Sequence, residues 1–170
     1  MNNEATLVRT GERPILRFER HLSRPIDAVW RAVTDPNEMK AWFPTQIVID
    51  EWKVGASLTH VFEEHAIDPL PGKVLDYDPP HRLRFTWGTD TIGFELTEAG
   101  DGGTIFVLTE ELGASIAARN AAGWEVCLDR LVNHQGEDWQ PRFERYVAAF
   151  EPVLGPQEGP PQDWQENHGA

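Results

Sequence analysis

Residues 113–150 constrain the fold most strongly, because most of this stretch has the pattern of an amphipathic helix. Its apolar side chains recur at helical spacing in the series Trp124, Leu128 and Leu131, flanked by Ala121 and Cys127. After a break at residues 135–141, the spacing resumes with Phe143, Val147 and Phe150. A stripe this wide must be buried against another element. Because the chain before it is strand-like, we expect this helix to pack on a sheet.

The chain before residue 113 alternates between apolar and polar residues in short runs that are separated by turn residues. In residues 15–22, for example, Leu16, Phe18 and Leu22 share one face, as in a half-buried strand. Strands are predicted at residues 15–22, 45–51, 57–63, 72–77, 81–87, 91–97 and 104–112, and short helices at 23–34 and 37–42. The links between the strands are too short for parallel crossovers. The sheet should therefore be antiparallel and the fold class α+β.

The 170 residues are enough for one domain with short ends. Residues 1–13 are polar, and we expect a flexible N-terminal segment. The folded domain is predicted to span residues 14–150. Residues 151–170 are rich in proline and glycine, acidic, and poor in apolar side chains apart from Trp164, so we expect a flexible tail.

The net charge of −13 argues against nucleic acid and anionic membrane surfaces as partners, because both require clustered Lys and Arg. The single cysteine, Cys127, allows no intramolecular disulfide and fits a reducing compartment. No secretory signal and no run of about 18 apolar residues is visible. We therefore expect a cytoplasmic protein.

Three parts of the chain resemble a known family. They read RHLSRPIDAVW at 20–30 running into VTDP at 33–36, MKAWFP at 39–44, and GGT at 102–104 followed by GW at 123–124 and CLDRL at 127–131. Over roughly residues 15–150 the chain is similar to the START-like (SRPBCC, Bet v 1-like) superfamily. Within that superfamily it most resembles the branch named after the activator of Hsp90 ATPase homologue 1.

The resemblance implies a helix-grip fold. In this fold a curved antiparallel sheet, here of about six or seven strands, wraps around the long C-terminal helix, with a hydrophobic cavity between them. Members of the superfamily include ligand carriers, cyclases, stress proteins and co-chaperone domains. The resemblance therefore says more about the fold than about the activity.

Large apolar side chains are the first candidates for lining such a cavity, since ligand pockets are mostly apolar and aromatic. The candidate ligand-binding residues of this kind are Trp42, Phe43, Phe62, Phe85, Trp87, Phe94, Phe106, Trp124, Cys127, Leu128 and Leu131. The alternative is that each ring only fills the core.

Two polar residues share strand faces with these rings. His60 lies between Leu58 and Phe62, and Glu110 follows Phe106 and Leu108 at strand spacing. Inside one apolar cavity they could anchor a ligand or act as weak candidates for a catalytic acid and base. Alternatively, His60 is a satisfied core residue and Glu110 lies at a solvated rim. The strand of Glu110 is apolar on both faces, so its parity leaves the choice open.

Other chemistries are not favoured. His60 and His65 lack the spacing of zinc-binding helices, so we predict no metal site. Cys127 on the apolar stripe is expected to be a small core residue rather than a nucleophile. No phosphate loop or dinucleotide fingerprint is present, and we predict no cofactor. The pairs Asp129–Arg130 and Glu144–Arg145 are expected to form ion pairs at the surface.

Three functions follow from these patterns. The leading hypothesis is binding of a lipid-, aromatic- or polyketide-like molecule between sheet and helix, with no catalysis indicated by the sequence. The second is a cyclase-, aromatase- or hydrolase-type enzyme that uses His60 and Glu110. The third is a protein-binding module that acts on Hsp90. The sequence leaves open the identity of the ligand, whether there is any catalysis, the oligomeric state, a homodimer included, and the role of the acidic tail.

Overall fold

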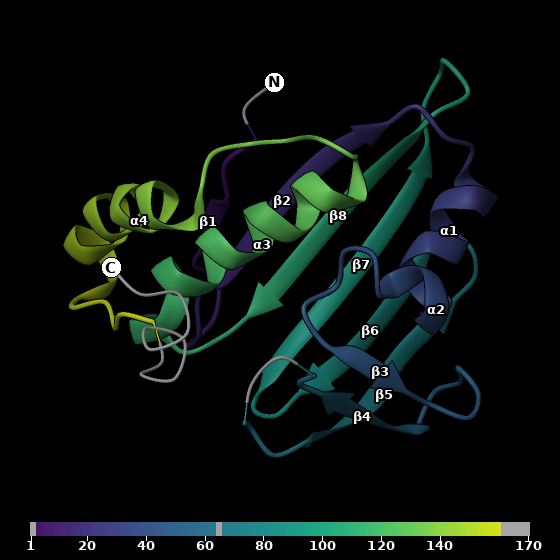
Figure 1. Ribbon diagram of the computed structural model, residues 1–170, viewed down its shortest axis with the longest axis horizontal. Helices are drawn as coiled ribbons and strands as arrows, with labels where there is room; N and C mark the ends of the chain where they lie inside the picture. The colour runs from purple at the N-terminus through teal and green to yellow at the C-terminus, as the bar shows by residue number, and fades with distance from the viewer. Residues whose placement is uncertain (1–2, 64–65, 161–170) are drawn as a thin grey trace.

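The computed structural model describes residues 3–63 and 66–160. Within them the chain forms one antiparallel sheet with helices on its concave side (Figure 1). The strands are β1 (Thr6–Val8), β2 (Ile15–Leu22), β3 (Gln46–Val48), β4 (Ser57–Val61), β5 (Leu70–Asp78), β6 (Arg82–Trp87), β7 (Asp90–Glu98) and β8 (Thr104–Glu111). The helices are α1 (Ile26–Thr34), α2 (Pro36–Met39), the single 3-10 turn Ala114–Ile116, α3 (Ala117–Leu131) and α4 (Trp139–Leu154).

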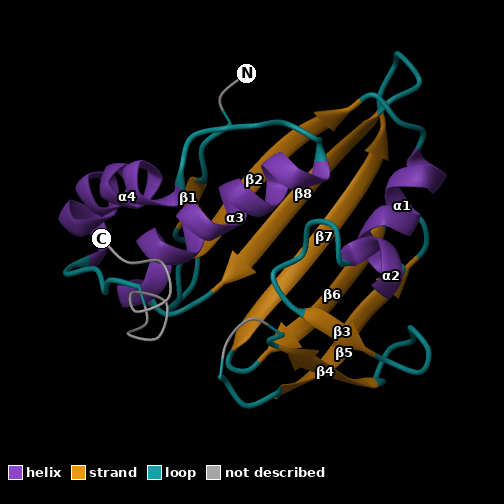
Figure 2. Cartoon of the chain, viewed as in Figure 1, coloured by secondary structure: helices purple, strands orange, loops and turns teal. Residues whose placement is uncertain are grey.

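The strand order in the sheet is β1-β2-β8-β7-β6-β5-β4-β3. Strands β3 to β8 are neighbours in the order of the chain, as expected when short turns connect them. Only β2 reaches across, to pair with β8 along its whole length from Ile15–Glu111 to Leu22–Thr104. The sheet curves around α3, which crosses its face between α4 and the α1–α2 pair (Figure 2). The predicted α+β helix-grip fold is confirmed, with eight strands in the described residues rather than six or seven.

The extra strand comes from the N-terminal segment that we predicted to be flexible. Residues Thr6–Val8 pair with Arg17, Leu16 and Ile15 of β2. The Tyr146 hydroxyl of α4 also accepts a hydrogen bond of 2.7 Å from the Ala5 backbone N–H. The prediction was wrong for these residues because β1 has only three residues and little alternation of its own. The strand forms because its backbone pairs with β2, and the sequence of β1 gives no sign of this pairing.

The short helices begin and end at residues that favour such boundaries. Pro25 precedes α1 in an extended conformation rather than forming its first turn. Between α1 and α2, the Asp35 side chain accepts a 2.9 Å hydrogen bond from the Asn37 N–H and so caps α2. Trp42, just after α2, donates its indole N–H to the Ala32 carbonyl at 2.9 Å. This bond fixes the short helices to each other at one end of the sheet.

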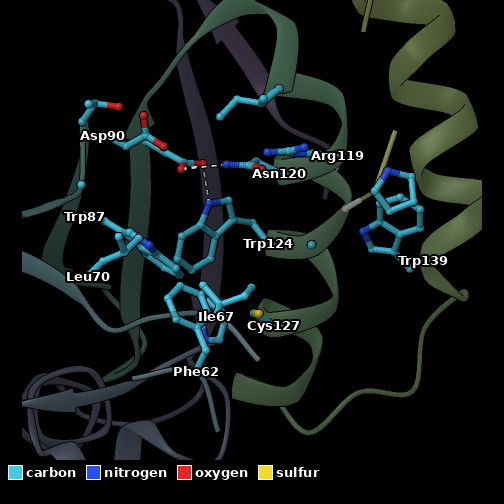
Figure 3. Close-up of a pocket in the computed structure, with 17 residues that line it drawn as sticks. Phe62, Ile67, Leu70, Trp87, Asp90, Arg119, Asn120, Trp124, Cys127 and Trp139 are labelled. Atoms are coloured by element: carbon cyan, nitrogen blue, oxygen red, sulfur yellow. Dashed lines mark hydrogen bonds between the residues drawn. The ribbon is translucent and has the colours of Figure 1, made fainter. Parts of the chain in front are cut away.

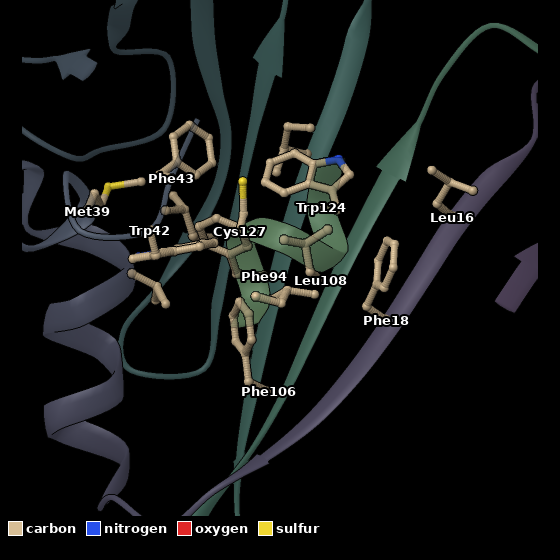
Figure 4. Close-up of a cluster of buried hydrophobic side chains, with 14 of the residues drawn as sticks. Leu16, Phe18, Met39, Trp42, Phe43, Phe94, Phe106, Leu108, Trp124 and Cys127 are labelled. Atoms are coloured by element: carbon tan, nitrogen blue, oxygen red, sulfur yellow. The ribbon is translucent and has the colours of Figure 1, made fainter. Parts of the chain in front are cut away.

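The core fills the space between the sheet, the short helices and the middle of α3 (Figure 4). Strand side chains such as Phe94 and Phe106 meet Trp42 from the helix side, at ring-centroid distances of 5.8 and 6.2 Å. Leu128 of α3 is fully buried in the same cluster. The central part of the grip is therefore packed with side chains, so any cavity must lie toward one end of α3.

The predicted helical stretch contains two helices, and the break between them lies at residues 132–138, three residues before the predicted 135–141. Helix α4 packs beside α3, and this changes the environment of residues expected at the surface. Asp129 does not form the expected surface pair with Arg130. It binds Arg142 of α4, and the side chains of Asp129 and Arg142 are only 13% and 6% exposed. Arg145 reaches Glu4, Glu125 and Glu137 instead of pairing with Glu144. Helical periodicity alone cannot show that a second helix covers this face.

The chain remains ordered past residue 150, where we predicted the flexible tail to begin. Helix α4 extends to Leu154, and residues 155–160 return to the start of α3. There the Gln157 side-chain oxygen accepts the Ala118 N–H at 2.9 Å. The remainder of the predicted tail, including Trp164, lies outside the described residues. The described part of the chain has no helix with the length and hydropathy of a membrane span.

Candidate ligand-binding site

A pocket of about 640 Å³ lies where the first half of α3 meets one end of the sheet (Figure 3). The sheet contributes the end of β6, the start of β7, the start of β5 and the end of β8. The residues lining the pocket are Pro44, Phe62, Ile67, Leu70, Trp87, Gly88, Thr89, Asp90, Glu110, Ile116, Arg119, Asn120, Gly123, Trp124, Cys127, Trp139 and Pro160. Its volume falls within the range of ligand sites for small molecules.

Aromatic rings form one corner of this pocket. The rings of Trp87 and Trp124 stand almost perpendicular, at an interplanar angle of 87° and a centroid distance of 6.2 Å. Phe62 lies against Trp87 at 6.0 Å. Trp87 comes from the sheet and Trp124 from the helix, so the corner is built across the two layers. In this T-shaped arrangement the edge of one ring lies against the face of the other, so the two rings hold each other in place at the wall of the pocket.

Glu110 lies in the wall beside this corner, with only 3% of its surface exposed. Its two oxygens accept hydrogen bonds from different residues of α3. The Trp124 indole N–H donates to Oε2 at 2.7 Å, and the Asn120 amide donates to Oε1 at 3.0 Å. The end of β8 and the first half of α3 thus meet at one carboxyl group, which lies inside the fold and not at a solvated rim.

Burial raises the pKa of the Glu110 carboxyl to about 8. The hydrogen bond from Trp124 lowers this pKa, and the neighbouring Asp90 carboxylate raises it through its charge and a shared hydrogen bond. Glu110 is therefore mostly protonated at neutral pH. Both of its oxygens also accept hydrogen bonds from N–H donors of α3.

The other charged residues of the pocket have ionic partners. Asp90 binds Arg13 at 2.9 Å, and Arg13 also donates to the Thr89 carbonyl. Arg119 lies 3.7 Å from the Glu158 carboxylate and donates to the Gly159 carbonyl at 3.3 Å. Both charged side chains are thus paired with an opposite charge.

Residues 155–160 form a wall of the pocket through Pro160. Gln157 holds this segment by donating to the Ala114 carbonyl at 2.9 Å while accepting from Ala118. The Glu158 N–H donates to the Ser115 carbonyl at 2.8 Å. The segment that follows α4 thus binds one free N–H of the first turn of α3 and two carbonyls of the 3-10 turn before it.

The sequence of the chain identifies its protein family. Residues 23–136 match the family described as Activator of Hsp90 ATPase homolog 1-like protein. The chain belongs to this family. The match spans both short helices, the strands from β3 to β8 and all of α3, so it includes most of the pocket. No curated protein matches the chain in sequence.

Solved structures share the helix-grip architecture of this family member. EF2215 from Enterococcus faecalis, a conserved protein of unknown function, has a TM-score of 0.75 at 22% identity, covering 88% of this chain and 91% of that one. CalU16 from Micromonospora echinospora has a TM-score of 0.66 at 22% identity, covering 89% and 94%. DynU16, from the dynemicin biosynthetic locus, has a TM-score of 0.59 at 27% identity. That match covers 70% of this chain but only 46% of DynU16.

Five of the predicted ligand-binding residues line the pocket of this family member. They are Phe62, Trp87, Glu110, Trp124 and Cys127. Cys127 is 6% exposed, and burial raises the pKa of its thiol to about 12. A thiol held in its neutral form by an apolar wall is a weak nucleophile. Its environment is that of a small apolar side chain.

The other apolar candidates do not reach this pocket. Six are buried in the core, namely Trp42, Phe43, Phe85, Phe94, Phe106 and Leu128. Leu131 and one side of Trp42 line a separate, smaller hollow of about 180 Å³ next to α1 and α2. The alternation of a strand shows that a side chain points between the sheet and the helices. It does not show whether that side chain lies in the packed centre of this space or at the end where the pocket is.

His60 is a core residue with both ring nitrogens occupied. Nδ1 lies 3.2 Å from the Thr45 hydroxyl, and Nε2 lies 3.0 Å from the Thr86 carbonyl. Burial lowers the pKa of its imidazole, and the ring stacks on Trp87 at 4.8 Å. His60 does not line the pocket that contains Glu110. The hypothesis that His60 and Glu110 act as acid and base in one cavity is therefore not supported. His65, the other histidine considered as a metal ligand, lies outside the described residues.

Several pocket residues were missed from the sequence. On α3 they are Arg119, Asn120 and Gly123, which together with Cys127 form a polar and small-residue face beside the apolar stripe. This face has helical spacing and could have been noticed as a second stripe. Asp90, at the start of β7, and Pro160, from the C-terminal segment, carry no such signal. Their positions depend on how β7 and the returning chain meet α3.

Proposed function

We propose that this family member binds a hydrophobic small molecule in the pocket between α3 and the end of the sheet. The observation that carries the proposal is the pocket itself. Its volume of about 640 Å³ is well above the roughly 300 Å³ needed for a small ligand, and rings of Trp87, Trp124 and Phe62 form its wall. A single buried carboxyl, Glu110, provides a polar group that can fix the orientation of the ligand.

The likeness to DynU16, from the dynemicin biosynthetic locus, supports a small organic molecule as the ligand class. The match with that protein covers 70% of this chain, which is more than a local motif. It does not specify the molecule. Lipid-, aromatic- and polyketide-like ligands all fit an apolar wall with one polar group.

Gly123 offers a direct test, because it lies on the pocket face of α3. A Cβ atom added there would meet only the Trp139 Nε1 atom, at 4.0 Å. Gly123→Leu should therefore fill the pocket without disturbing the helix backbone. Gly123→Ala is the matched control, since it leaves most of the pocket free. Alanine should also stabilise α3 by about 1 kcal/mol relative to glycine.

Binding can be followed with the neutral fluorophore prodan, whose emission shifts to the blue in apolar sites. We expect saturable binding to the unchanged protein and to Gly123→Ala, and at least about a tenfold loss of affinity in Gly123→Leu, which occupies the space of the ligand. Circular dichroism and thermal unfolding would check that all three proteins are folded. Absence of saturable binding, or equal binding to folded Gly123→Leu, would contradict the proposal.

A further inference from the structure

The buried carboxyl of the pocket differs from its charged neighbours in its partners. Glu110 receives hydrogen bonds from the neutral donors Trp124 and Asn120. Within residues 3–63 and 66–160 it makes no ion pair, whereas Asp90 binds Arg13 and Arg119 binds Glu158. A carboxylate at this depth is costly unless a cation compensates its charge. A positively charged ligand could supply that compensation.

Glu110 also has acceptor capacity left for such a ligand. An ionised carboxylate offers about four lone-pair positions on its two oxygens. Trp124 and Asn120 use one position on each oxygen. Once Glu110 has lost its proton, two of the four positions are therefore left. A donor in the pocket can then hydrogen-bond to Glu110 without displacing its helix partners.

The aromatic corner beside Glu110 favours a positively charged donor. Trp124 joins the two features, since its N–H binds Glu110 while its ring forms the corner with Trp87. The face of an indole ring attracts cations, most strongly where water is excluded. Arg119, the basic residue of the pocket wall, has its charge offset by Glu158 on the side of the C-terminal segment.

We propose that the ligand is a hydrophobic primary or secondary amine, bound as its ammonium ion between the Glu110 carboxylate and the rings of Trp87 and Trp124. This inference rests on the proposed function and specifies its ligand class. The ammonium keeps its own proton and donates a hydrogen bond to Glu110. Glu110 releases its proton to solvent when the amine enters, so binding at pH 7 should release close to one proton for each amine bound. Asp90 and its partner Arg13, Arg119 and the neutral Cys127 are the other titratable groups facing this site.

Three naphthalene probes of similar shape test the inference by isothermal titration calorimetry. They are 1-naphthylmethylamine, 1-naphthylmethanol and 1-naphthoic acid, which are cationic, neutral and anionic at pH 7. We expect the amine to bind about tenfold or more tightly than the alcohol, and the acid to bind most weakly. Titration of the amine in two buffers with different ionisation enthalpies gives the number of protons released.

Glu110→Gln is the matched variant, because an amide resembles the neutral carboxylic acid in shape but cannot become an anion. Its proton release on amine binding should disappear, and the amine should lose its advantage over the alcohol. Equal or tighter binding of the alcohol by the unchanged protein would overturn the amine inference and leave the proposed function standing. Failure of all three probes, together with failure of prodan, would overturn both. The comparison of amine and alcohol in the unchanged protein needs no variant, so it decides the question even if Glu110→Gln folds poorly.

Discussion

The indole N–H of Trp124 donates a 2.7 Å hydrogen bond to Glu110 Oε2, across 14 positions of sequence. The bond connects the middle of α3 with the end of β8 at the wall of the pocket. It therefore joins helix and sheet where the grip is open, while ordinary apolar packing joins them at its centre. The same contact supports the fold and determines the polarity of the candidate site.

Replacing Trp124 with Phe should destabilise the protein. Phenylalanine retains an aromatic ring but leaves Oε2 of the buried Glu110 carboxyl without its donor, which costs about 1–3 kcal/mol. Because the Trp124 bond lowers the pKa of Glu110, its loss should also raise that pKa further. Urea unfolding at pH 7 would measure the free-energy change. Trp30→Phe, at a half-buried ring packed on Tyr77, is a suitable comparison; equal losses in the two variants would show that the Glu110 bond is not important for stability.

The contribution of Glu110 to the free energy of unfolding should fall as the pH rises from about 4.5 to about 8. The pKa of this carboxyl is raised to about 8 in the fold, from an ordinary value of 4.5. Between these values the folded protein holds a proton that the unfolded chain has lost. Stability from this group is therefore complete below pH 4.5 and is lost as the pH passes through 8, with a slope of up to roughly 1.4 kcal/mol per pH unit.

Glu110→Gln isolates this contribution. The variant cannot titrate at position 110, so its free energy of unfolding should depend less steeply on pH than that of the unchanged protein. The comparison also removes the effect of His60, whose lowered pKa has the opposite sign and makes stability rise with pH up to about 6.5. Parallel pH profiles for the two proteins would contradict a raised pKa at Glu110.

The sequence predicted an element correctly where a single pattern of apolar residues was enough to define it. The alternation in β2 predicted its limits, Ile15–Leu22, because one face of that strand is buried under the helices. It did not reveal Arg20, which shares the buried face and is only 5% exposed. The guanidinium group is accommodated because it donates to the Asn3 carbonyl at 2.8 Å, in the segment leading to β1. A contact with a segment predicted to be flexible cannot be inferred from strand alternation.

The pocket was harder to predict than the fold, for a geometrical reason. Parity and helical spacing show that Phe94 and Trp124 both point between the layers. They do not show that short-helix side chains such as Trp42 fill the space over Phe94 and leave the space beside Trp124 open. Another part of the wall comes from the chain after α4, through Pro160, and the composition of this segment resembled that of a flexible tail.

Cys127 should react slowly with thiol reagents in the folded protein. Burial raises the pKa of its thiol to about 12, so the reactive thiolate is scarce at pH 8, and the surrounding wall limits access. We expect alkylation by iodoacetamide to be roughly a hundredfold or more slower in the native protein than in urea, where the pKa returns to its ordinary value near 8.5. Mass spectrometry of the alkylated protein over time would give both rates. Similar rates in native and unfolded protein would show that the thiol is not buried.

The buried ion pair between α3 and α4 should be the most sensitive charged contact of the fold. Arg142 binds Asp129 with both side chains largely buried, and its Nε atom also donates to the Glu137 carbonyl at 2.8 Å. Arg142→Met leaves the Asp129 carboxylate buried without a cation, which should cost about 3–5 kcal/mol. Arg17→Met removes an exposed pair with Glu19 on the outer face of β2 and should cost less than about 1 kcal/mol.

The double variant Arg142→Met with Asp129→Leu distinguishes loss of the pair from loss of one partner. Apolar side chains of similar size can replace a buried ion pair with little loss, so we expect the double variant to recover most of the stability that Arg142→Met loses. Urea unfolding of the two single variants and the double variant completes the thermodynamic cycle. If Arg142→Met costs no more than Arg17→Met, the contact between α3 and α4 depends on the apolar packing of residues such as Tyr146 and Phe150, and the ion pair contributes little to holding the second helix in place.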